Sequence, residues 1–265
     1  MEPPLAQDHE AIAKGEQDWT RLDVPMEPYR FARRRLAGWR PKQRHRPDNF
    51  MESFAALPRH LDWRQRINVA GPMPQGDCNA CTSFAFAGVM TDLATIKVGH
   101  ATPLLSPGHF HCCVAHRDCG GGLDPNDAAK AAKATAVATQ QEGDYPFNPM
   151  ACPMAHGVVR LLEAYNLTSF TAAIQALQDG PIVGVMDLYD DFWRYYGGGI
   201  YRRQSATYLN RHTIALIGYD ADDGCWIVRN SRGTGWGEQG FARIAFNECR
   251  IFTSTGNWGL QLVIA

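Results

Sequence analysis

Apolar residues follow helical spacing in the first part of this chain and strand-like spacing in the second, with the change near Pro181. Helical spacing runs from Thr82 to Lys97, then through an alanine-rich stretch from Pro125 to about Ala138, and last from Thr171 to Asp179. The first of these segments carries apolar residues on nearly all sides, and Gly99 follows its end. The pattern therefore predicts three helices, the first of them central.

Beyond Pro181, short apolar runs are separated by turns rich in Gly and Asp. The predicted strands are Ile182–Leu188, Thr213–Tyr219, Trp226–Arg229, Phe241–Ala245 and Leu260–Ile264. Because the helices come first and the strands second, we expect an α+β fold with two lobes. A functional site is then expected in the cleft between the lobes.

Residues 1–56 differ from the rest and are interpreted as an N-terminal extension ahead of a body at 57–265. An acidic start is followed by arginines and lysines interleaved with Tyr29, Phe31 and Trp39. A solvated or loosely docked tail is the first interpretation, an ordered segment lying on the body the second, and nucleic-acid binding a remote third. The three aromatic residues favour docking over free disorder.

Composition sets broad limits on the class of protein. The chain has 265 residues, 45% of them hydrophobic, which is enough for a full core. A net charge of -1 gives no electrostatic reason to expect nucleic acid or an anionic membrane as partner, and no apolar run approaches the length of a membrane helix. No secretory signal is visible at the N-terminus, so we leave open a cytoplasmic location or export without a classical signal. Eight cysteines leave the redox compartment open as well.

Four residues carry the candidate chemistry: Gln75, Cys81, His212 and Asn230. Cys81 stands at a predicted helix start, where the helix dipole and a nearby imidazolium lower the pKa of a thiol. His212 follows Cys81 by 131 residues and Asn230 follows it by 149. That order and spacing are typical of a thiol nucleophile, its base and the residue that orients the base. Gln75, six residues before Cys81, is expected to donate its amide to an oxyanion.

Each of these residues has an ordinary structural explanation when taken alone. A cysteine at a helix start is usually a small buried hydrophobe, a histidine at a strand start is usually structural, and an asparagine usually forms a turn. The joint order, spacing and local sequence favour catalysis instead.

The chain resembles the papain family of cysteine peptidases over about residues 57–265. Further motifs carry the resemblance: Leu61–Arg64, Cys119–Gly122, Tyr145–Phe147, Asp191–Phe192 with Tyr196–Tyr201, and Asn230–Ser231 with Gly233–Glu238. The resemblance implies a papain-like two-lobe fold. Its N-terminal lobe is helical, its C-terminal lobe is an antiparallel, β-barrel-like sheet, and the active site lies in the cleft.

The resemblance also implies substrate-binding residues and disulfides. Gly121 and Gly122 are expected to bind the substrate backbone. The expected borders of the pocket for the residue two before the scissile bond are Leu123, Asp124, Val185 and Arg211. The expected disulfides join Cys78 to Cys119, and either Cys113 or Cys112 to Cys152, with Cys81 kept free.

A metal site is the competing interpretation of one cysteine-rich stretch. Six potential ligands fall within eleven positions: His109, His111, Cys112, Cys113, His116 and Cys119. Their spacing matches no standard zinc pattern, so we predict no metal.

Three residues depart from the family pattern. Thr82 stands where an aromatic residue usually follows the nucleophile, and Arg232 where a tryptophan usually covers the Asn–His hydrogen bond. Arg211 precedes His212, and a cation there disfavours the imidazolium unless it points to water or pairs with a carboxylate. Thr82 and the short extension with its Gly38–Pro41 segment resemble bacterial members of the family.

These observations together predict a monomeric cysteine endopeptidase that needs no cofactor and cleaves protein or peptide substrates through an acyl-enzyme. Neither nucleic acid nor membrane is expected as a partner. One rival is a catalytically impaired papain-like binding module, favoured by Arg211 and Arg232. The other is an acyltransferase or amidase that uses the same triad. Because Asp124 and Arg211 make the specificity pocket polar, we do not expect a unique preference for bulky apolar side chains there.

Overall fold

The computed structural model describes residues 57–140, 157–252 and 256–264 of the 265-residue chain. Its elements in chain order are β1 (His60–Asp62), η2 (Trp63–Gln65), α2 (Cys81–Val98), η3 (His109–Val114), α3 (Pro125–Ala134), β2 (Val159–Asn166), α4 (Phe170–Ala176), β3 (Ile182–Tyr189), α5 (Asp190–Tyr195), β4 (Ile200–Tyr201), β5 (Tyr208–Asp220), β6 (Cys225–Arg229), β7 (Phe241–Ala245) and β8 (Trp258–Ile264). Helices dominate the first half and strands the second, as the hydrophobic pattern predicts. None of the helices in the described ranges is long and apolar enough to cross a membrane.

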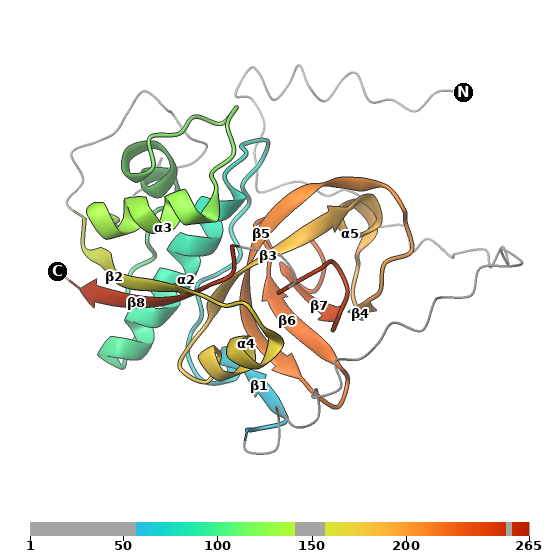
Figure 1. Ribbon diagram of the computed structural model, residues 1–265. Helices are drawn as coiled ribbons and strands as arrows, with labels where there is room; N and C mark the ends of the chain where they lie inside the picture. The colour runs from blue at the N-terminus through green and yellow to red at the C-terminus, as the bar shows by residue number, and fades with distance from the viewer. Residues whose placement is uncertain (1–56, 141–156, 253–255, 265) are drawn as a thin grey trace, which may run out of the picture. The chain divides into compact units, whose positions relative to one another are not determined.

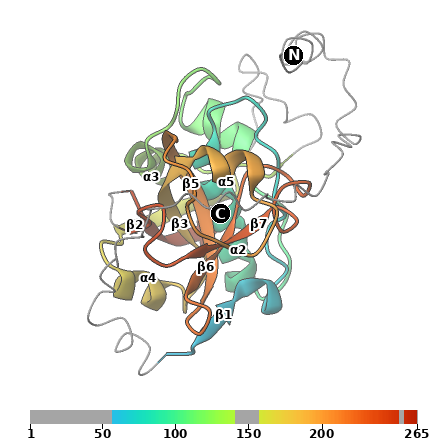
Figure 2. The same cartoon turned by 90° about the vertical axis from the view of Figure 1, so that its right-hand side faces the viewer.

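Helix α2 is the central helix that the sequence predicts. Phe86, Val89 and Met90 on it are fully buried, and it begins at Cys81, one residue before the predicted start. The helix ends at Gly99, whose φ of 79° is favourable for a residue without a Cβ. Figures 1 and 2 show α2 running alongside the sheet, next to β5.

Helix α3 is shorter than predicted because its last four expected residues are extended. Thr135 has strand-like dihedral angles, and the Val137 N–H donates to the carbonyl of Val159 at 2.7 Å. The β-branched residues Thr135 and Val137 lose rotamer freedom in a helix and are accommodated better in extended backbone. Asp124 caps α3 as predicted, with its carboxylate accepting the Asn126 N–H at 2.8 Å.

The sheet is largely antiparallel, in the order β2-β8-β3-β5-β6-β7-β4, with β1 pairing β5 and a parallel pair between β4 and β7. All five predicted strands are present within two residues of their predicted bounds except β5, which starts five residues earlier. Edge strand β2 and helix α5 were not predicted. Leu162 and Tyr165 on β2 are exposed, so this strand lacks the apolar signal of a buried one.

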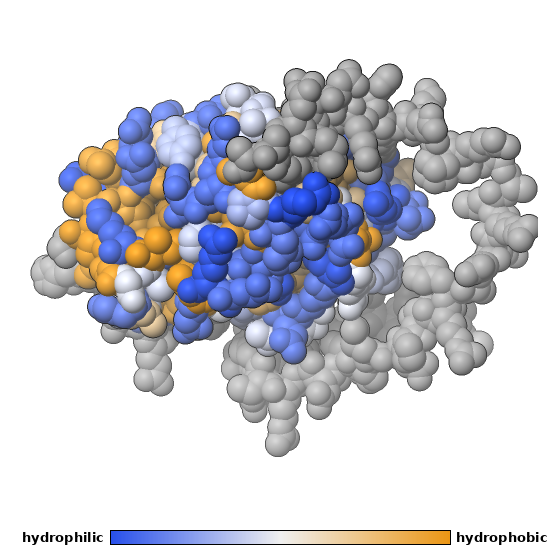
Figure 3. Space-filling model, turned by 90° about the horizontal axis from the view of Figure 1, so that it is seen from below, coloured by the Kyte–Doolittle hydropathy of each residue, from blue (hydrophilic) through white to orange (hydrophobic). Residues whose placement is uncertain are grey.

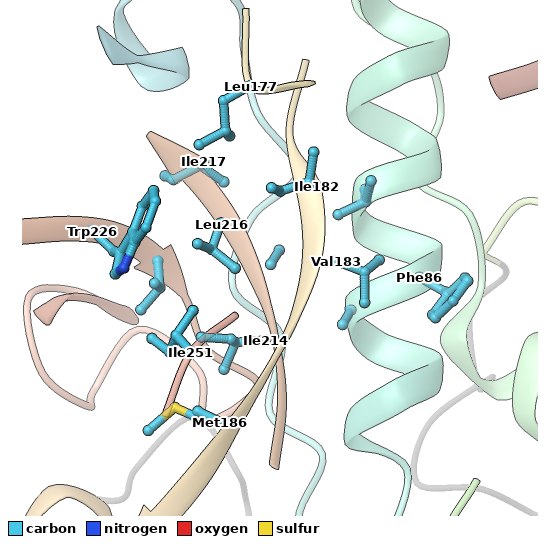
Figure 4. Close-up of a cluster of buried hydrophobic side chains, with 14 of the residues drawn as sticks. Phe86, Leu177, Ile182, Val183, Met186, Ile214, Leu216, Ile217, Trp226 and Ile251 are labelled. Carbon is cyan, nitrogen blue, oxygen red and sulfur yellow. The ribbon is translucent and has the colours of Figure 1, made fainter. Parts of the chain in front are cut away.

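The core lies on both sides of strands β3 and β5. Figure 4 shows Val183 of β3 beside α2, and Leu216 and Ile217 of β5 on the side of Trp226. Figure 3 shows the apolar residues of one face gathered on its left, where β2 and β8 lie in Figure 1. The antiparallel register of β3 with β5 sets Met186 opposite His212 and so fixes the position of His212 next to the core.

Candidate active site

Cys81 is the first residue of α2, at the positive end of the helix dipole. The N-cap residue Ala80 provides no side-chain hydrogen bond to the helix end, so the first N–H groups of α2 remain oriented toward this region. The preceding loop is held by the disulfide between Cys78 and Cys119, which confirms that predicted pair. The Cys81 thiol is free and half-buried.

His212 and Asn230 come together from adjacent strands. His212 lies in β5, and Asn230 follows the last residue of β6. The Nε2 atom of His212 lies 2.8 Å from Oδ1 of Asn230, which also accepts the Ser231 N–H at 2.8 Å. Because Oδ1 is an acceptor, Nε2 carries a proton and donates it, and Nδ1 is left to face the thiol. Both side chains are buried, with 3% exposure each.

The electrostatics favour a thiolate–imidazolium pair. Burial alone raises the pKa of Cys81, but the hydrogen bond and charge of His212, together with hydrogen bonds from Thr213, lower it to about 7. Burial lowers the pKa of His212, whereas Cys81 and the hydrogen bond to Asn230 raise it above its ordinary value overall. Each group thus stabilises the charged form of the other.

The two arginines near the pair act differently. Arg211 is exposed on β5. Arg232 is the cation whose charge lowers the pKa of His212, against the larger opposing effects of Cys81 and Asn230. The sequence predicts that a neighbouring arginine disfavours the His212 imidazolium. In the structure that arginine is Arg232, and its effect on the pKa of His212 is smaller than the combined effects of Cys81 and Asn230.

Trp193 covers one side of His212 and was missed by the sequence reasoning. Its ring lies edge-to-face against the imidazole, with the ring centroids 5.3 Å apart. The guanidinium carbon of Arg232 lies 4.2 Å from the centre of the Trp193 ring. A tryptophan therefore still packs on the histidine, but it comes from α5. The signal was available, since Trp193 directly follows the Asp191–Phe192 motif.

Gln75 is fixed by both parts of the site. Its Nε2 donates to the Cys78 carbonyl at 2.7 Å, and its Oε1 accepts a short hydrogen bond from the Ser231 hydroxyl. Its backbone N–H donates to the Ser231 carbonyl at 2.9 Å. The amide has two N–H groups, so one remains for a ligand. Ser231, also missed from sequence, couples Gln75 to the residue after Asn230.

Thr82 uses its hydroxyl group for buried hydrogen bonds. Its side chain is buried, and its Oγ1 donates to the Leu123 carbonyl at 2.7 Å and lies 2.9 Å from Oγ1 of Thr213. These bonds tie α2 to the glycine-rich loop and to β5.

The glycine-rich loop is built around Asp118. The Oδ1 atom of Asp118 accepts the N–H groups of Gly120 and Gly121, both at 3.0 Å. Gly122 is exposed, and a Cβ added to it would meet no atom within 4 Å. Gly122 therefore has the room that a substrate backbone needs, whereas the N–H of Gly121 is already engaged.

The residues expected to border the specificity pocket are only partly brought together. Leu123 and Val185 are buried, and Gly256 places its backbone against both Val185 and Pro125, the first residue of α3. Asp124 is exposed but engaged in capping α3, and Arg211 is exposed. The two buried residues of the expected pocket, Leu123 and Val185, are therefore both apolar.

The state of the other cysteines removes ligands from the alternative zinc site. Cys113 is disulfide-bonded, whereas its neighbour Cys112 is a free thiol. The expected partner, Cys152, lies outside the described residues. Because the sulfurs of Cys113 and Cys119 are in disulfides, they do not ligate a metal, and the described residues contain no group of three or more His, Cys, Asp or Glu that could hold one.

A buried ion pair joins the two halves of the site. Arg229 precedes Asn230, and its NH1 atom donates to Oδ2 of Asp92 on α2 at 2.9 Å and to the Ala70 carbonyl at 2.8 Å. Burial raises the pKa of Asp92, while Arg229 and the Ala70 N–H act in the opposite direction. Gly88 makes room for the guanidinium, because a Cβ there would lie 2.4 Å from it.

The fold and the site define an α+β protein with a thiol, an imidazole and an amide aligned in one hydrogen-bonded set. The chain belongs to the papain family of cysteine proteases, whose family model matches residues 57–256. It is 28% identical to fruit bromelain of Ananas comosus over 79% of this chain and 60% of that protein. Identity to cathepsin J of Mus musculus is also 28%, over 74% of this chain and 63% of that protein.

Solved structures show the same fold. Bromelain from Ananas comosus in complex with the E64 inhibitor matches 77% of this chain and 99% of that chain, with a TM-score of 0.65 and 24% identity. A digestive procathepsin L 3 of Tenebrio molitor gives the same score and identity. The chain spans less than two thirds of the length of fruit bromelain and cathepsin J. These relatives come from plants and animals, so they do not support the predicted bacterial type.

Proposed function

We propose that this chain is a cysteine endopeptidase that hydrolyses peptide bonds in protein or peptide substrates. The observation that carries the proposal is the hydrogen-bonded set of Cys81, His212 and Asn230, in which the pKa of the thiol is lowered to about 7. A thiol poised in this way is a nucleophile near neutral pH, whereas an ordinary buried cysteine is inert.

The residues divide the reaction between them. The Cys81 thiolate attacks the scissile carbonyl, forming the S–C bond, and the negative charge moves to the carbonyl oxygen. The second N–H of Gln75 and the backbone N–H of Cys81 stabilise that oxyanion. The C–N bond then breaks as His212 gives its proton to the departing amine. Water, deprotonated by His212, attacks the thioester, releases the acid and returns the thiol.

Labelling of the thiol tests this proposal. An epoxysuccinyl probe is expected to modify wild-type protein at Cys81 and to fail with Cys81→Ala. Cys112→Ala is the matched control, because Cys112 is the other half-buried free thiol of the described residues and burial raises its pKa. Labelling equal in wild type and Cys81→Ala would overturn the proposal.

A catalytically impaired binding module is the second candidate, favoured by the charge of Arg232 acting against the His212 imidazolium. Peptide binding without turnover in a protein that the probe still labels slowly is the result that would support it. Acyl transfer with the same triad is distinguished by product analysis with added amines. Hydrolysis products alone are expected.

The proposed unit is the body at 57–265, with residues 1–56 as an extension that docks on it and limits access to the site. The extension lies outside the described residues, and its Gly38–Pro41 segment is, together with Thr82, the ground for proposing a bacterial-type member. Turnover and unfolding of a chain lacking residues 1–50 test the docking. Unchanged values for both would contradict it. The proposed peptidase acts as a monomer on peptide chains, with neither nucleic acid nor membrane as partner.

A further inference from the structure

The proposed function defines a leaving-group side of the site, and the inference below rests on it. His212 gives its proton to the departing amine, so the first residue after the scissile bond must lie next to the imidazole. Gly122, expected to hold the acyl portion, belongs to the opposite side, in the loop tied to α2. The residues packed around His212 are therefore the ones that the leaving group contacts.

Trp193 and Arg232 are the residues found there. The Trp193 ring stands edge-to-face on the imidazole, and the Arg232 guanidinium lies over the Trp193 ring. Trp193 is half-buried, whereas Arg232 remains exposed. The stack holds a cation close to the reacting histidine while leaving its N–H groups accessible from solvent.

The charges around Arg232 do not neutralise it. Asp77 attracts the guanidinium and Arg194 repels it, and among the described residues no ion pair within 4 Å involves Arg232. Asp77 and Arg194 are both exposed. The region next to the leaving group thus carries two arginines and one aspartate, and it is net positive.

We propose that Arg232, held on Trp193, is a specificity residue that binds a carboxylate carried by the first residue after the scissile bond. Stacking restricts the side chain before substrate arrives, so less conformational entropy is lost on binding. The planar guanidinium matches a carboxylate with two parallel hydrogen bonds. Arg232 stands where the family resemblance leads us to expect an apolar tryptophan, so a preference for a carboxylate does not follow from the family pattern.

Matched peptides that differ only in that residue test the proposal. Glu, Gln and Lys are compared there in otherwise identical, C-terminally amidated peptides, and kcat/KM is measured at low and high salt. The expected order is Glu, then Gln, then Lys. The Glu-to-Gln ratio is expected to be about fivefold at low ionic strength and to fall as salt screens the pair.

Three variants separate this role from a structural one. Arg232→Gln is expected to bring the Glu-to-Gln ratio close to one. Asp77→Asn removes the competing carboxylate and is expected to raise the ratio. Arg160→Gln is the control, since Arg160 is also exposed but lies on the edge strand β2, and it is expected to keep the ratio of wild type.

A further peptide distinguishes two sources of the carboxylate. It ends one residue after the scissile bond with Gln and a free C-terminus, so its only nearby carboxylate is terminal. Faster cleavage of this peptide than of its amide, lost in Arg232→Gln, supports binding of the chain end by the same arginine. A Glu-to-Gln ratio near one in wild type, or one that survives in Arg232→Gln, overturns the proposal. If the Gln peptide is still cleaved, the peptidase function stands and only the role of Arg232 in specificity is overturned.

Discussion

The α2 half of the site and the β5–β6 half are held in different ways. In the α2 half, replacement of an aromatic residue by Thr82 is compensated by buried hydrogen bonds to Leu123 and Thr213. In the strand half, Arg232 stands where the family pattern has a tryptophan, Trp193 packs against His212, and the Arg232 guanidinium lies over the Trp193 ring. The Thr82 side chain is buried and makes hydrogen bonds inside the protein, whereas Arg232 is exposed and adds a positive charge to the surface. Function is therefore expected to respond to salt mainly through the strand half.

The largest expected effect comes from breaking the pair that joins the halves. Asp92→Ala leaves the Arg229 guanidinium buried without its carboxylate, and we expect the free energy of unfolding to fall by about 3–5 kcal/mol. Urea denaturation measures this loss. Asp127→Ala on α3 is the control, because its exposed pair with Lys130 is expected to contribute less than about 1 kcal/mol. Equal losses in the two variants would show that the halves are not joined through Asp92.

Removing an oxyanion donor is expected to give the next largest effect. Gln75→Ala should lower kcat for peptide hydrolysis by about 100-fold to 1000-fold with a smaller change in KM. Alkylation by iodoacetamide forms no oxyanion, so its rate at Cys81 separates this role from a structural one. If both rates fell by the same factor, Gln75 would act by holding the loop and not by stabilising the oxyanion.

Asn230→Ala tests the orientation of the imidazole in the strand half. Loss of a hydrogen bond to a charged group costs about 1.5–3 kcal/mol, so kcat/KM is expected to fall by about tenfold to 150-fold. The pKa of Cys81 should rise as well, because a less ordered His212 stabilises the thiolate less. Asn230→Gln is the comparison, and activity equal to wild type in the alanine variant would exclude an orienting role.

The smallest expected effect concerns the influence of Arg232 on the pKa of His212. Arg232 lowers the pKa of His212, so Arg232→Gln should raise that pKa and extend activity toward alkaline pH, by less than about one pH unit. The alkaline limb of the kcat/KM profile measures this. Arg211→Gln should leave the limb in place, and a shift toward acid in Arg232→Gln would reverse the assigned sign.

The sequence allowed the site to be predicted better than its surroundings. Order and spacing selected Cys81, His212 and Asn230, which the structure brings into one hydrogen-bonded set, because each of them stands in a distinctive local sequence. Asp92 could not be identified in this way, since its role depends on Arg229, which is far away in the chain. Trp193 was missed although it directly follows the Asp191–Phe192 motif, because its contact with His212 is visible only in three dimensions. Strand β2 was missed because an edge strand with exposed Leu162 lacks a strong apolar pattern. The adjacent pair Cys112 and Cys113 could be distinguished only in three dimensions.

The central claim is that Cys81 and His212 form a thiolate–imidazolium pair near neutral pH despite Arg232. The pH dependence of iodoacetamide alkylation at Cys81, followed by mass spectrometry of its peptide, tests it most directly. The account predicts that the rate rises with an inflection at about 7, and that His212→Gln moves the inflection to higher pH. An inflection in wild type at or above the ordinary thiol value of 9.0, unchanged by His212→Gln, would contradict it.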